Sequence, residues 1–322
     1  MRLIVILRYT KEKGENPSMR KILITGGTVF VSRSLAEYFV GKGDDVYVLN
    51  RNNHPQPEGV TLIEADRYQL GEALKKTEFD AVIDVNAYTA EEIRLLLDAL
   101  PAINDYVFIS TSAVYPETLP QPFTETQVVG PNRYWTSYGT NKIAAEQVLF
   151  ERVPQAYILR PAYIYGPYNN AYREAFVFDC AKEKRPFYLP GDGSQGLQFI
   201  HIEDLCRLVE GLISTKPEQK IYNVGNETMI SIKDWVTAGY EAVGEEVSFV
   251  QVPDTQNQSQ YFSFPNYQYE LDVAQQTAII GKTKDIREGL TESWKWYREN
   301  EEVVNKRDYL AYIERELSKE IN

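Results

Sequence analysis

The sequence predicts an α/β protein with a doubly wound, Rossmann-type parallel sheet and a smaller C-terminal α/β lobe. Two observations predict the sheet. Short β-rich runs alternate with helical segments from Lys21 to about Ala162, and the first run leads directly into the pair Gly26-Gly27. This alternation is typical of βαβ units. Several of the runs are apolar throughout, which indicates strands covered on both faces.

The first half of the chain divides into strands and helices in a regular order. The expected strands are Lys21–Thr25, Asp45–Leu49, Thr61–Ile63, Ala81–Val85, Tyr106–Ser110 and Ala156–Leu159. The expected helices, in which apolar residues recur at helical spacing, are Ser34–Val40, Leu70–Lys76, Ala90–Leu100 and Tyr138–Arg152.

After Arg160 the alternation loosens. Two Tyr- and Gly-rich stretches, Tyr163–Tyr172 and Pro190–Gly196, are predicted binding loops. A helix over Glu203–Ile213 and a strand over Ile221–Val224 are expected to rejoin the first sheet, and helices over Ile232–Val243 and Asp285–Glu299 to build the smaller lobe. Glu302–Glu320 is expected to be a charged amphipathic helix that forms a solvated cap.

Composition excludes several classes of function. The 322 residues are 43% apolar and 25% charged, as in a globular protein. A net charge of −12 disfavours nucleic acid and anionic membrane surfaces as partners. Cys180 and Cys206 lack C-x-x-C spacing, and the only histidines, His54 and His201, are far apart in sequence. We therefore expect no metal site and no Ser-His-Asp relay.

Residues 1–18 form an N-terminal extension with two interpretations. The apolar run Leu3–Leu7 is too short for a signal peptide or a membrane span. It is either an added edge strand or lies upstream of a natural start at Met19, in which case the extension is non-native. We favour the second interpretation, because Met19-Arg20 immediately precedes the first strong strand. Without another long apolar stretch, we expect a cytoplasmic protein.

The run Lys21–Thr28 passes from a strand into Gly26-Gly27, and a helix follows from Phe30. Such a turn presents backbone N–H groups and a helix N-terminus to a pyrophosphate. In the G-x-x-G-x-x-G pattern, however, Val29 and Ser32 replace the second and third glycines. Ser32 is small enough for close helix packing, whereas Val29 should crowd the phosphates. The alternative is a helix start that binds no ligand.

The end of the second strand predicts which dinucleotide binds. A carboxylate there would bind the ribose hydroxyls of NAD, but this chain has Asn50 and Arg51. Asn50 can hydrogen-bond a ribose hydroxyl, and Arg51 can pair with a 2′-phosphate, so NAD and NADP both remain open. Alternatively, Arg51 is a solvated loop cation. Asp66, after the next strand, is placed to accept from the adenine amino group.

Tyr138 and Lys142 lie one helical turn apart on one face of a predicted helix. The Y-x-x-x-K spacing also occurs at Tyr9 and Tyr38, so it is not specific by itself. Only Tyr138 accompanies a strand that ends in hydroxyl-bearing residues, Ser110-Thr111-Ser112. A cation beside a phenol stabilises its phenolate, so Tyr138 would act as base, Lys142 would supply the charge and Thr111 would bind the same substrate oxygen.

These segments together resemble the extended short-chain dehydrogenase/reductase family of NAD-dependent sugar epimerases and dehydratases. The resemblance runs from about Met19 to Val224, in the glycine turn, Ser110–Tyr115, Tyr138–Lys142, Arg160–Pro167, Gln198–Asp204 and Tyr222–Gly225. It implies a nucleotide-sugar substrate, NAD or NADP as cofactor and a homodimer formed through the two helices before and at Tyr138. Residues 19–165, with 198–225 returning to them, would bind the dinucleotide, and residues 166–197 and 226–322 would form the substrate lobe.

Matched to the family, Thr111, Tyr138 and Lys142 take the catalytic positions. The implied cofactor contacts are Gly26, Gly27, Thr28, Val29, Phe30, Asn50, Arg51, Asp66, Arg67, Asn86, Ala87, Lys142 and Tyr165. The candidate substrate contacts are Ser112, Asp192, Gln198 and His201, although Asp192 and Gln198 are equally interpreted as turn residues.

The family's sugar 4,6-dehydratases carry an Asp-Glu pair where this chain has Ser112-Ala113, which favours epimerisation or simple oxidation and reduction. The chain also resembles a subgroup that includes the chloroplast stem-loop-binding proteins, in its glycine turn, Leu49–Arg51 and Glu64–Arg67. RNA binding is thus a competing hypothesis, which the acidity of the chain argues against. A non-catalytic sensor or scaffold that keeps the fold is the third.

Overall fold

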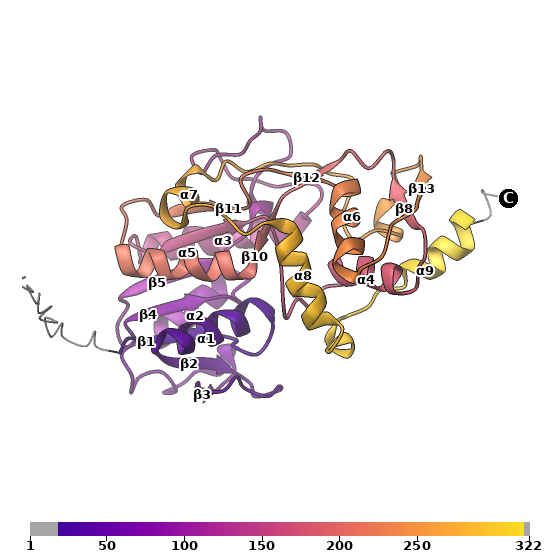
Figure 1. Cartoon of the computed structure of the whole chain (residues 1–322). Coiled ribbons are helices and arrows are strands. Elements are labelled where there is room, and N and C mark those ends of the chain that lie inside the picture. Colours follow the sequence, from indigo (N-terminus) through magenta and orange to yellow (C-terminus); the bar gives the residue numbers. More distant parts are fainter. Residues whose placement is uncertain (1–18, 319–322) are drawn as a thin grey trace, which may run out of the picture.

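The structure is a computed structural model that describes residues 19–318, so the predicted N-terminal extension lies outside the described residues (Figure 1). Residues 19–318 form a sheet-containing lobe and a smaller, mainly helical lobe beside it (Figure 1). Within these residues, none of the helices combines the length and the apolar character that crossing a bilayer requires.

Seven parallel strands of the described chain form the central sheet, in the order β11-β6-β5-β4-β1-β2-β3. They are β1 (Lys21–Thr25), β2 (Asp45–Asn50), β3 (Thr61–Glu64), β4 (Ala81–Asp84), β5 (Asp105–Ile109), β6 (Tyr157–Pro161) and β11 (Ile221–Val224). The first six confirm the predicted strands to within two residues. β11 pairs with β6 at the edge, as predicted for a segment that rejoins the sheet.

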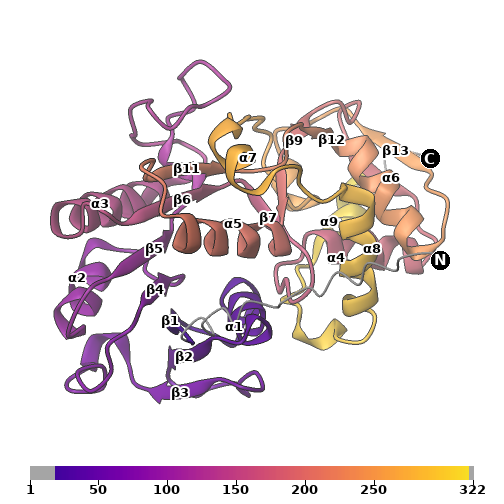
Figure 2. The same cartoon turned by 60° about the vertical axis from the view of Figure 1, so that its left-hand side comes forward.

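Helices cover both faces of the sheet, which confirms the doubly wound fold. α1 (Phe30–Lys42) and α5 (Ile202–Thr215) pack together on one face, and α2 (Ala90–Ala99) and α3 (Thr136–Arg152) on the other (Figure 2). Successive strand side chains point to opposite faces. Ile22 and Ile24 of β1 therefore join the core beneath α1 and α5, whereas Leu23 joins the core beneath α2 and α3.

Local sequence sets the helix ends. α2 begins at a capping box, in which the Thr89 side chain accepts from the backbone N–H of Glu92 and the Glu92 carboxylate accepts from the backbone N–H of Thr89. α1 ends at Gly43, which adopts a left-handed conformation with φ of 87°.

The predicted helix over Leu70–Lys76 is wrong. The chain forms a short 3₁₀ turn, η1 (Arg67–Gln69), and then further turns. Gly71 has a φ of 50°, which a right-handed helix does not accommodate. Leu70 and Leu74 are nonetheless buried, so the apolar spacing identified core positions but not a helix.

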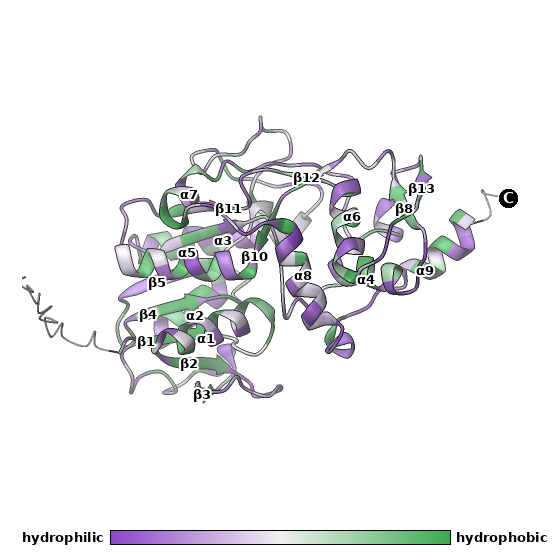
Figure 3. Ribbon diagram, viewed as in Figure 1, coloured by the Kyte–Doolittle hydropathy of each residue, from purple (hydrophilic) through white to green (hydrophobic). Residues whose placement is uncertain are grey.

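The smaller lobe is built around an aromatic core. It contains α4 (Glu174–Lys182), α6 (Ile232–Val243), α8 (Ile286–Tyr297), the parallel pair β8 (Phe187–Pro190) and β13 (Phe249–Val252), and the antiparallel pair β9 (Gly196–Leu197) and β12 (Ile230–Ser231). Trp235 of α6 stacks on Phe199 with ring centroids 5.4 Å apart. The helices carry hydrophobic and hydrophilic stripes, as expected for helices that cover a core on one side only (Figure 3).

Two segments of the C-terminal region differ from expectation. α7 (Ala274–Ile280) packs against α5 and β11 of the sheet rather than within the smaller lobe, because the Gln276 amide pairs with both backbone groups of Gly225. The Glu302–Glu320 helix begins only with α9 (Tyr309–Tyr312) and continues as a π-helical turn, Ile313–Leu317. Tyr309 and Ile313 are buried, so the segment packs on the lobe instead of forming a solvated cap.

Candidate active site

A cleft of about 740 Å³ lies at the carboxyl ends of the parallel strands. Residues that end or follow β1, β2, β4, β5 and β6 line it, and Tyr269 lines it from the C-terminal region. The strand order reverses between β1 and β4, and ligands of open α/β sheets bind at such a reversal. The topology of the sheet therefore places the cleft where a dinucleotide is expected.

The glycine turn forms a backbone cradle at the floor of the cleft. Gly26 and Gly27 both have a φ of 94°. A Cβ on Gly27 would lie 2.4 Å from Val48 Cγ1, and one on Gly26 would lie 2.8 Å from Ser32 Oγ. α1 starts at the cleft with no side-chain cap and no acidic residue in its first turn. Its free N–H groups fit a pyrophosphate, so this end of the cleft fits a dinucleotide.

The two altered positions of the glycine motif behave differently. Ser32 is buried, and its hydroxyl donates to the carbonyl of Val29 at 2.9 Å, so a small polar residue satisfies the close packing of helix and strand. Val29 lines the cleft with 37% of its surface exposed, at the N-cap of α1. Its branched side chain thus stands at the helix end where phosphate oxygens would bind.

Asn50, Arg51 and Asp66 line the end of the cleft beside β2 and β3. Asn50 donates to the carbonyl of Gly26 at 2.6 Å and to Gln56 at 3.0 Å, so its amide braces the glycine turn. Arg51 is exposed and lies 4.0 Å from Asp66. Asp66 lines the cleft, and its other oxygen accepts from the backbone N–H of Tyr68.

Arg67 is held by a buried carboxylate. Its guanidinium donates to Asp84 at 2.6 and 3.0 Å and to Asn86 at 2.7 Å. Asp84 also accepts from Thr25 and Tyr106, and these partners keep the pKa of Asp84 below its ordinary value despite complete burial. Arg67 and Asn86 line the cleft, but their polar groups are largely committed to this network beneath the glycine turn.

Thr111, Tyr138 and Lys142 all line the same cleft. Thr111 follows β5, and the other two project from α3. Close packing brings this helix to the strand end: a Cβ on Gly139 would lie 2.4 Å from the carbonyl oxygen of Ala113. The glycine after Tyr138 therefore allows the helix to approach the hydroxyl-bearing turn.

The ammonium of Lys142, a residue of α3, is buried. It donates to the carbonyl oxygens of Ala87 and Ile109, each at 2.8 Å. Burial lowers the pKa of Lys142 from 10.5 to about 8. Ala87 is itself buried and contributes to the site through this carbonyl.

Tyr138 is half exposed, and its ring lies 6.2 Å from that of Tyr88. Desolvation raises the pKa of Tyr138, while a hydrogen bond with Thr111 and the charge of Arg173 oppose the rise. From the sequence, Lys142 was expected to supply the charge that stabilises the Tyr138 phenolate. In the structure the ammonium is directed to backbone carbonyls, so the groups that favour the phenolate are Thr111 and Arg173.

A buried ion pair fixes α3 to the sheet. Arg160 donates to Glu146 at 2.6 Å, and Glu146 accepts from Ser110 at 2.5 Å. Arg160 also donates to the hydroxyl of Tyr115 at 2.9 Å. Glu146 lies one turn beyond Lys142 on α3, and Ser110 immediately precedes Thr111. The network therefore links the two elements that carry the catalytic candidates.

Of the predicted substrate contacts, Ser112 lines the cleft and Asp192, Gln198 and His201 do not. Asp192 is a turn residue, whose carboxylate accepts from the backbone N–H of Ser194. Gln198 is buried, and its amide donates to the carbonyl of Asn226 and accepts from the N–H of Leu271. The turn interpretation thus fits Asp192, and Gln198 joins loops of the chain.

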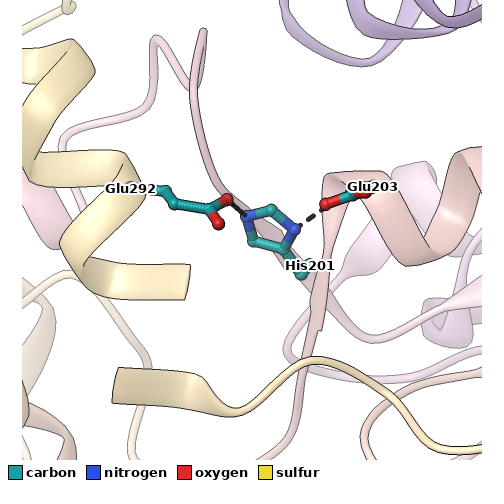
Figure 4. A group of neighbouring side chains, drawn as sticks. All are labelled: His201, Glu203 and Glu292. Carbon is teal, nitrogen blue, oxygen red and sulfur yellow. Dashed lines mark hydrogen bonds and ion pairs between the residues drawn. The ribbon is translucent and has the colours of Figure 1, made fainter. Parts of the chain in front are cut away.

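Tyr165, a predicted cofactor contact in β7 (Tyr163–Tyr165), also lies outside the cleft lining, against His201 with ring centroids 5.1 Å apart. His201 ends β10 (Phe199–His201) and accepts from the backbone N–H of Glu203, with Glu292 of α8 3.5 Å away (Figure 4). The Lys284 ammonium binds both carboxylates, at 2.5 and 2.7 Å. It occupies the position between them that a cation would take.

Tyr269 and Arg173 are among the cleft residues that the sequence analysis did not predict. Tyr269 accepts from Ser112 at 3.1 Å and comes from a segment without a motif. Arg173 follows directly after the predicted binding loop Tyr163–Tyr172. Asn169 and Asn170 of that loop also line the cleft, so the loop prediction located the right region but not the charged residue.

A model of the NAD dependent epimerase/dehydratase family matches residues 22–225. The chain belongs to this family. Family membership confirms the predicted fold class, the relation to extended short-chain dehydrogenases/reductases and a nicotinamide dinucleotide as the cofactor, and it supports an enzyme in general. It leaves the choice between NAD and NADP open.

The similar proteins are named for different functions. Chloroplast stem-loop binding protein of 41 kDa b from Arabidopsis thaliana is 28% identical over 302 residues, covering 86% of this chain and 79% of the relative. UDP-glucose 4-epimerase from Corynebacterium glutamicum is 27% identical over 271 residues, covering 70% and 82%. Among solved structures, the Bacillus cereus UDP-glucuronic acid 4-epimerase, in complex with UDP-glucuronic acid and NAD, has a TM-score of 0.67 at 19% identity, covering 87% of this chain and 99% of that one.

Proposed function

We propose that this chain is an NAD(P)-dependent epimerase or oxidoreductase that acts on a nucleotide-sugar by hydride transfer. The observation that carries the proposal is the convergence of Thr111, Tyr138 and Lys142 on one cleft with the glycine turn. More than 80 residues of sequence separate the glycine turn from Thr111, Tyr138 and Lys142, yet they meet at a single cleft at the reversal point of the sheet.

The dinucleotide would bind along the strand ends. The Gly26-Gly27 turn and the N-terminus of α1 would hold its pyrophosphate, with Arg51 and Asp66 at the adenosine end. When bound, the nicotinamide supplies a hydride acceptor and donor. The exposed Arg51 is the group available for a 2′-phosphate, so NADP remains as acceptable as NAD in this proposal.

The chain's own residues would manage the substrate proton. Tyr138 would take the proton from a sugar hydroxyl while Thr111 hydrogen-bonds the same oxygen. Lys142, held by two backbone carbonyls, has further donor capacity toward the ribose side of the cleft. Return of the proton by Tyr138 to the same oxygen would complete epimerisation, whereas release of the ketone after the first proton transfer would complete simple oxidation.

The turn after Thr111 favours these reactions over dehydration. Elimination requires an acid and a base beside the catalytic threonine, and this chain places Ser112 and Ala113 there. Ser112 hydrogen-bonds Tyr269, and Ala113 is buried beneath α3. Neither is a carboxylate.

Turnover tests the proposal directly. The purified protein is incubated with NAD or NADP and UDP-glucose or UDP-glucuronic acid, and the sugar products are followed by proton NMR and the reduced cofactor by absorbance. We expect an epimer or an oxidised sugar from wild type and none from Tyr138→Phe. Cofactor binding without any turnover would favour the sensor or scaffold alternative, which the exposed Val29 supports.

RNA binding is the alternative suggested by the name of the Arabidopsis relative, and a net charge of −12 opposes it. Filter binding to a structured RNA at physiological salt should show no specific complex.

We also propose a homodimer through α2 and α3, for which light scattering should give twice the chain mass of 37.0 kDa.

A further inference from the structure

Arg173 is a cation of the cleft without a carboxylate partner. Its guanidinium lies 5.1 Å from the ring centroid of Tyr163 and 5.7 Å from that of Phe264. Its one hydrogen bond within residues 19–318 is a long contact of 3.5 Å to the carbonyl of Ile164. Within the same residues it forms no ion pair, so most of its donors are available to a ligand.

Of the other cleft cations in residues 19–318, Arg51 is exposed at the adenosine end, and Arg67 and Lys142 are already engaged. Arg67 is paired with Asp84, and Lys142 donates to two carbonyls. The carboxylates that line the cleft within residues 19–318 are Asp66 and Glu92, and both lie at the adenosine end, where Glu92 caps α2 and accepts from Tyr68. Among residues 19–318, the lining of the end that contains Arg173 therefore has a positive charge and no carboxylate, although the buried Glu174 follows Arg173 directly in sequence.

Two tyrosines, Tyr163 and Tyr269, lie near this guanidinium. The Arg173 guanidinium lies over the ring of Tyr163. The Tyr163 hydroxyl is buried and has no hydrogen-bond partner among residues 19–318. Tyr269 packs on Tyr163 with ring centroids 5.8 Å apart and accepts from Ser112 at 3.1 Å, which leaves its own proton to donate. Ser112 directly follows Thr111. A guanidinium and tyrosine hydroxyls thus adjoin the catalytic hydroxyl.

We propose that Arg173, with Tyr163 and Tyr269, forms an oxyanion subsite that binds the carboxylate of a nucleotide-linked uronic acid. A planar guanidinium binds a carboxylate through two parallel hydrogen bonds. In a protein of net charge −12, an anionic sugar needs such a fixed cation at the site. The inference rests on the proposed function and adds to it the class of sugar.

The position of the subsite favours a sugar carboxylate over the diphosphate. It lies beside Ser112 and electrostatically influences Tyr138, so the bound oxyanion belongs near the reacting carbinol. In a hexose oxidised at C4, a uronate carboxylate is attached to the neighbouring C5. The diphosphate is attached at C1, on the far side of the ring.

Calorimetry on the NAD-saturated protein separates the two sources of oxyanion. The probes are UDP-glucuronic acid, UDP-glucose and UDP. We expect wild type to bind UDP-glucuronic acid about tenfold or more tightly than UDP-glucose. Arg173→Gln should weaken UDP-glucuronic acid by about 10- to 100-fold and leave the other two nearly unchanged. Arg173→Lys should restore part of the loss, and Arg298→Gln, at an exposed site on the smaller lobe, should change nothing.

The outcomes are distinct. An equal loss for all three probes in Arg173→Gln would place the diphosphate at Arg173 and overturn the inference. Tight binding of UDP-glucose by wild type without a preference for UDP-glucuronic acid would also overturn it, while the proposed function stands. Failure of all three probes to bind wild type would remove the proposed function for uridine sugars together with the inference. Unchanged NAD affinity in Arg173→Gln shows that the variant is folded.

Discussion

Replacing Lys142 by methionine removes a buried charge and should change how stability depends on pH. The ammonium is 2% exposed and is held by the carbonyls of Ala87 and Ile109. Methionine is similar in length and keeps the apolar packing around the lysine stem. The lost hydrogen bonds add an offset that does not depend on pH, so the pH dependence isolates the ammonium.

The magnitude follows from the pKa of Lys142. Burial lowers it from 10.5 in the ordinary side chain to about 8, which corresponds to about 3 kcal/mol. Because the folded pKa is the lower one, the unfolded chain binds more protons between these values, and stability rises with pH across that window. Between about pH 7 and about pH 9.5, Lys142 should add about 2 kcal/mol to the free energy of unfolding of wild type.

Urea unfolding of the cofactor-free protein, followed by tryptophan fluorescence, measures this change. Wild type and Lys142→Met are compared at four pH values across the window, with Lys295→Met on the exposed surface of α8 as the control for loss of one lysine. The difference between wild type and Lys142→Met should shift in favour of wild type by about 2 kcal/mol as pH rises. A difference that stays constant within about 0.5 kcal/mol would refute the reasoning, because the lysine would then titrate as in water.

Three further perturbations test other parts of the site. Tyr138→Phe should lower turnover by about 10²- to 10⁴-fold with dinucleotide affinity within about threefold, as measured by steady-state kinetics and titration; retained turnover would assign the base elsewhere. Arg160→Met leaves the buried Glu146 unpaired and should cost about 3–5 kcal/mol in urea unfolding, against less than about 1 kcal/mol for the exposed Arg152→Met. Val29→Gly should tighten dinucleotide binding about tenfold in fluorescence titrations, and an unchanged affinity would show that Val29 does not crowd the phosphates.

The sequence predicted the sheet well because each strand is an independent local pattern. Continuous apolar runs such as Ala81–Ile83 and Tyr106–Ile109 are buried on both faces, and such runs between helical segments clearly indicate strands. The helix predicted over Leu70–Lys76 failed because a single glycine conformation, at Gly71, outweighed the apolar spacing. Backbone conformation at one residue is not encoded in periodicity.

The sequence predicted the residues of the candidate site that lie at strand ends. It missed residues that reach the cleft from loops distant in sequence. Thr111 and Ser112 follow directly from the end of β5, whereas Tyr269 reaches the cleft only through the packing of the smaller lobe. Gln198 and His201 lie in a segment that resembles the family. Both side chains are nevertheless buried away from the cleft, where Gln198 contacts a loop and His201 contacts α8. Motif order identifies the element, but tertiary packing decides which side of it faces the ligand.

Calorimetric titration of the protein with NAD, NADH, NADP and NADPH tests the central claim most directly, because every proposed step requires a dinucleotide in the cleft beside Tyr138. The structure predicts binding of at least one of the four, and that binding should weaken when Gly26 is replaced by valine, whose side chain would meet Ser32. The absence of detectable binding to all four would contradict the account, since the glycine turn would then be a helix start that holds no ligand.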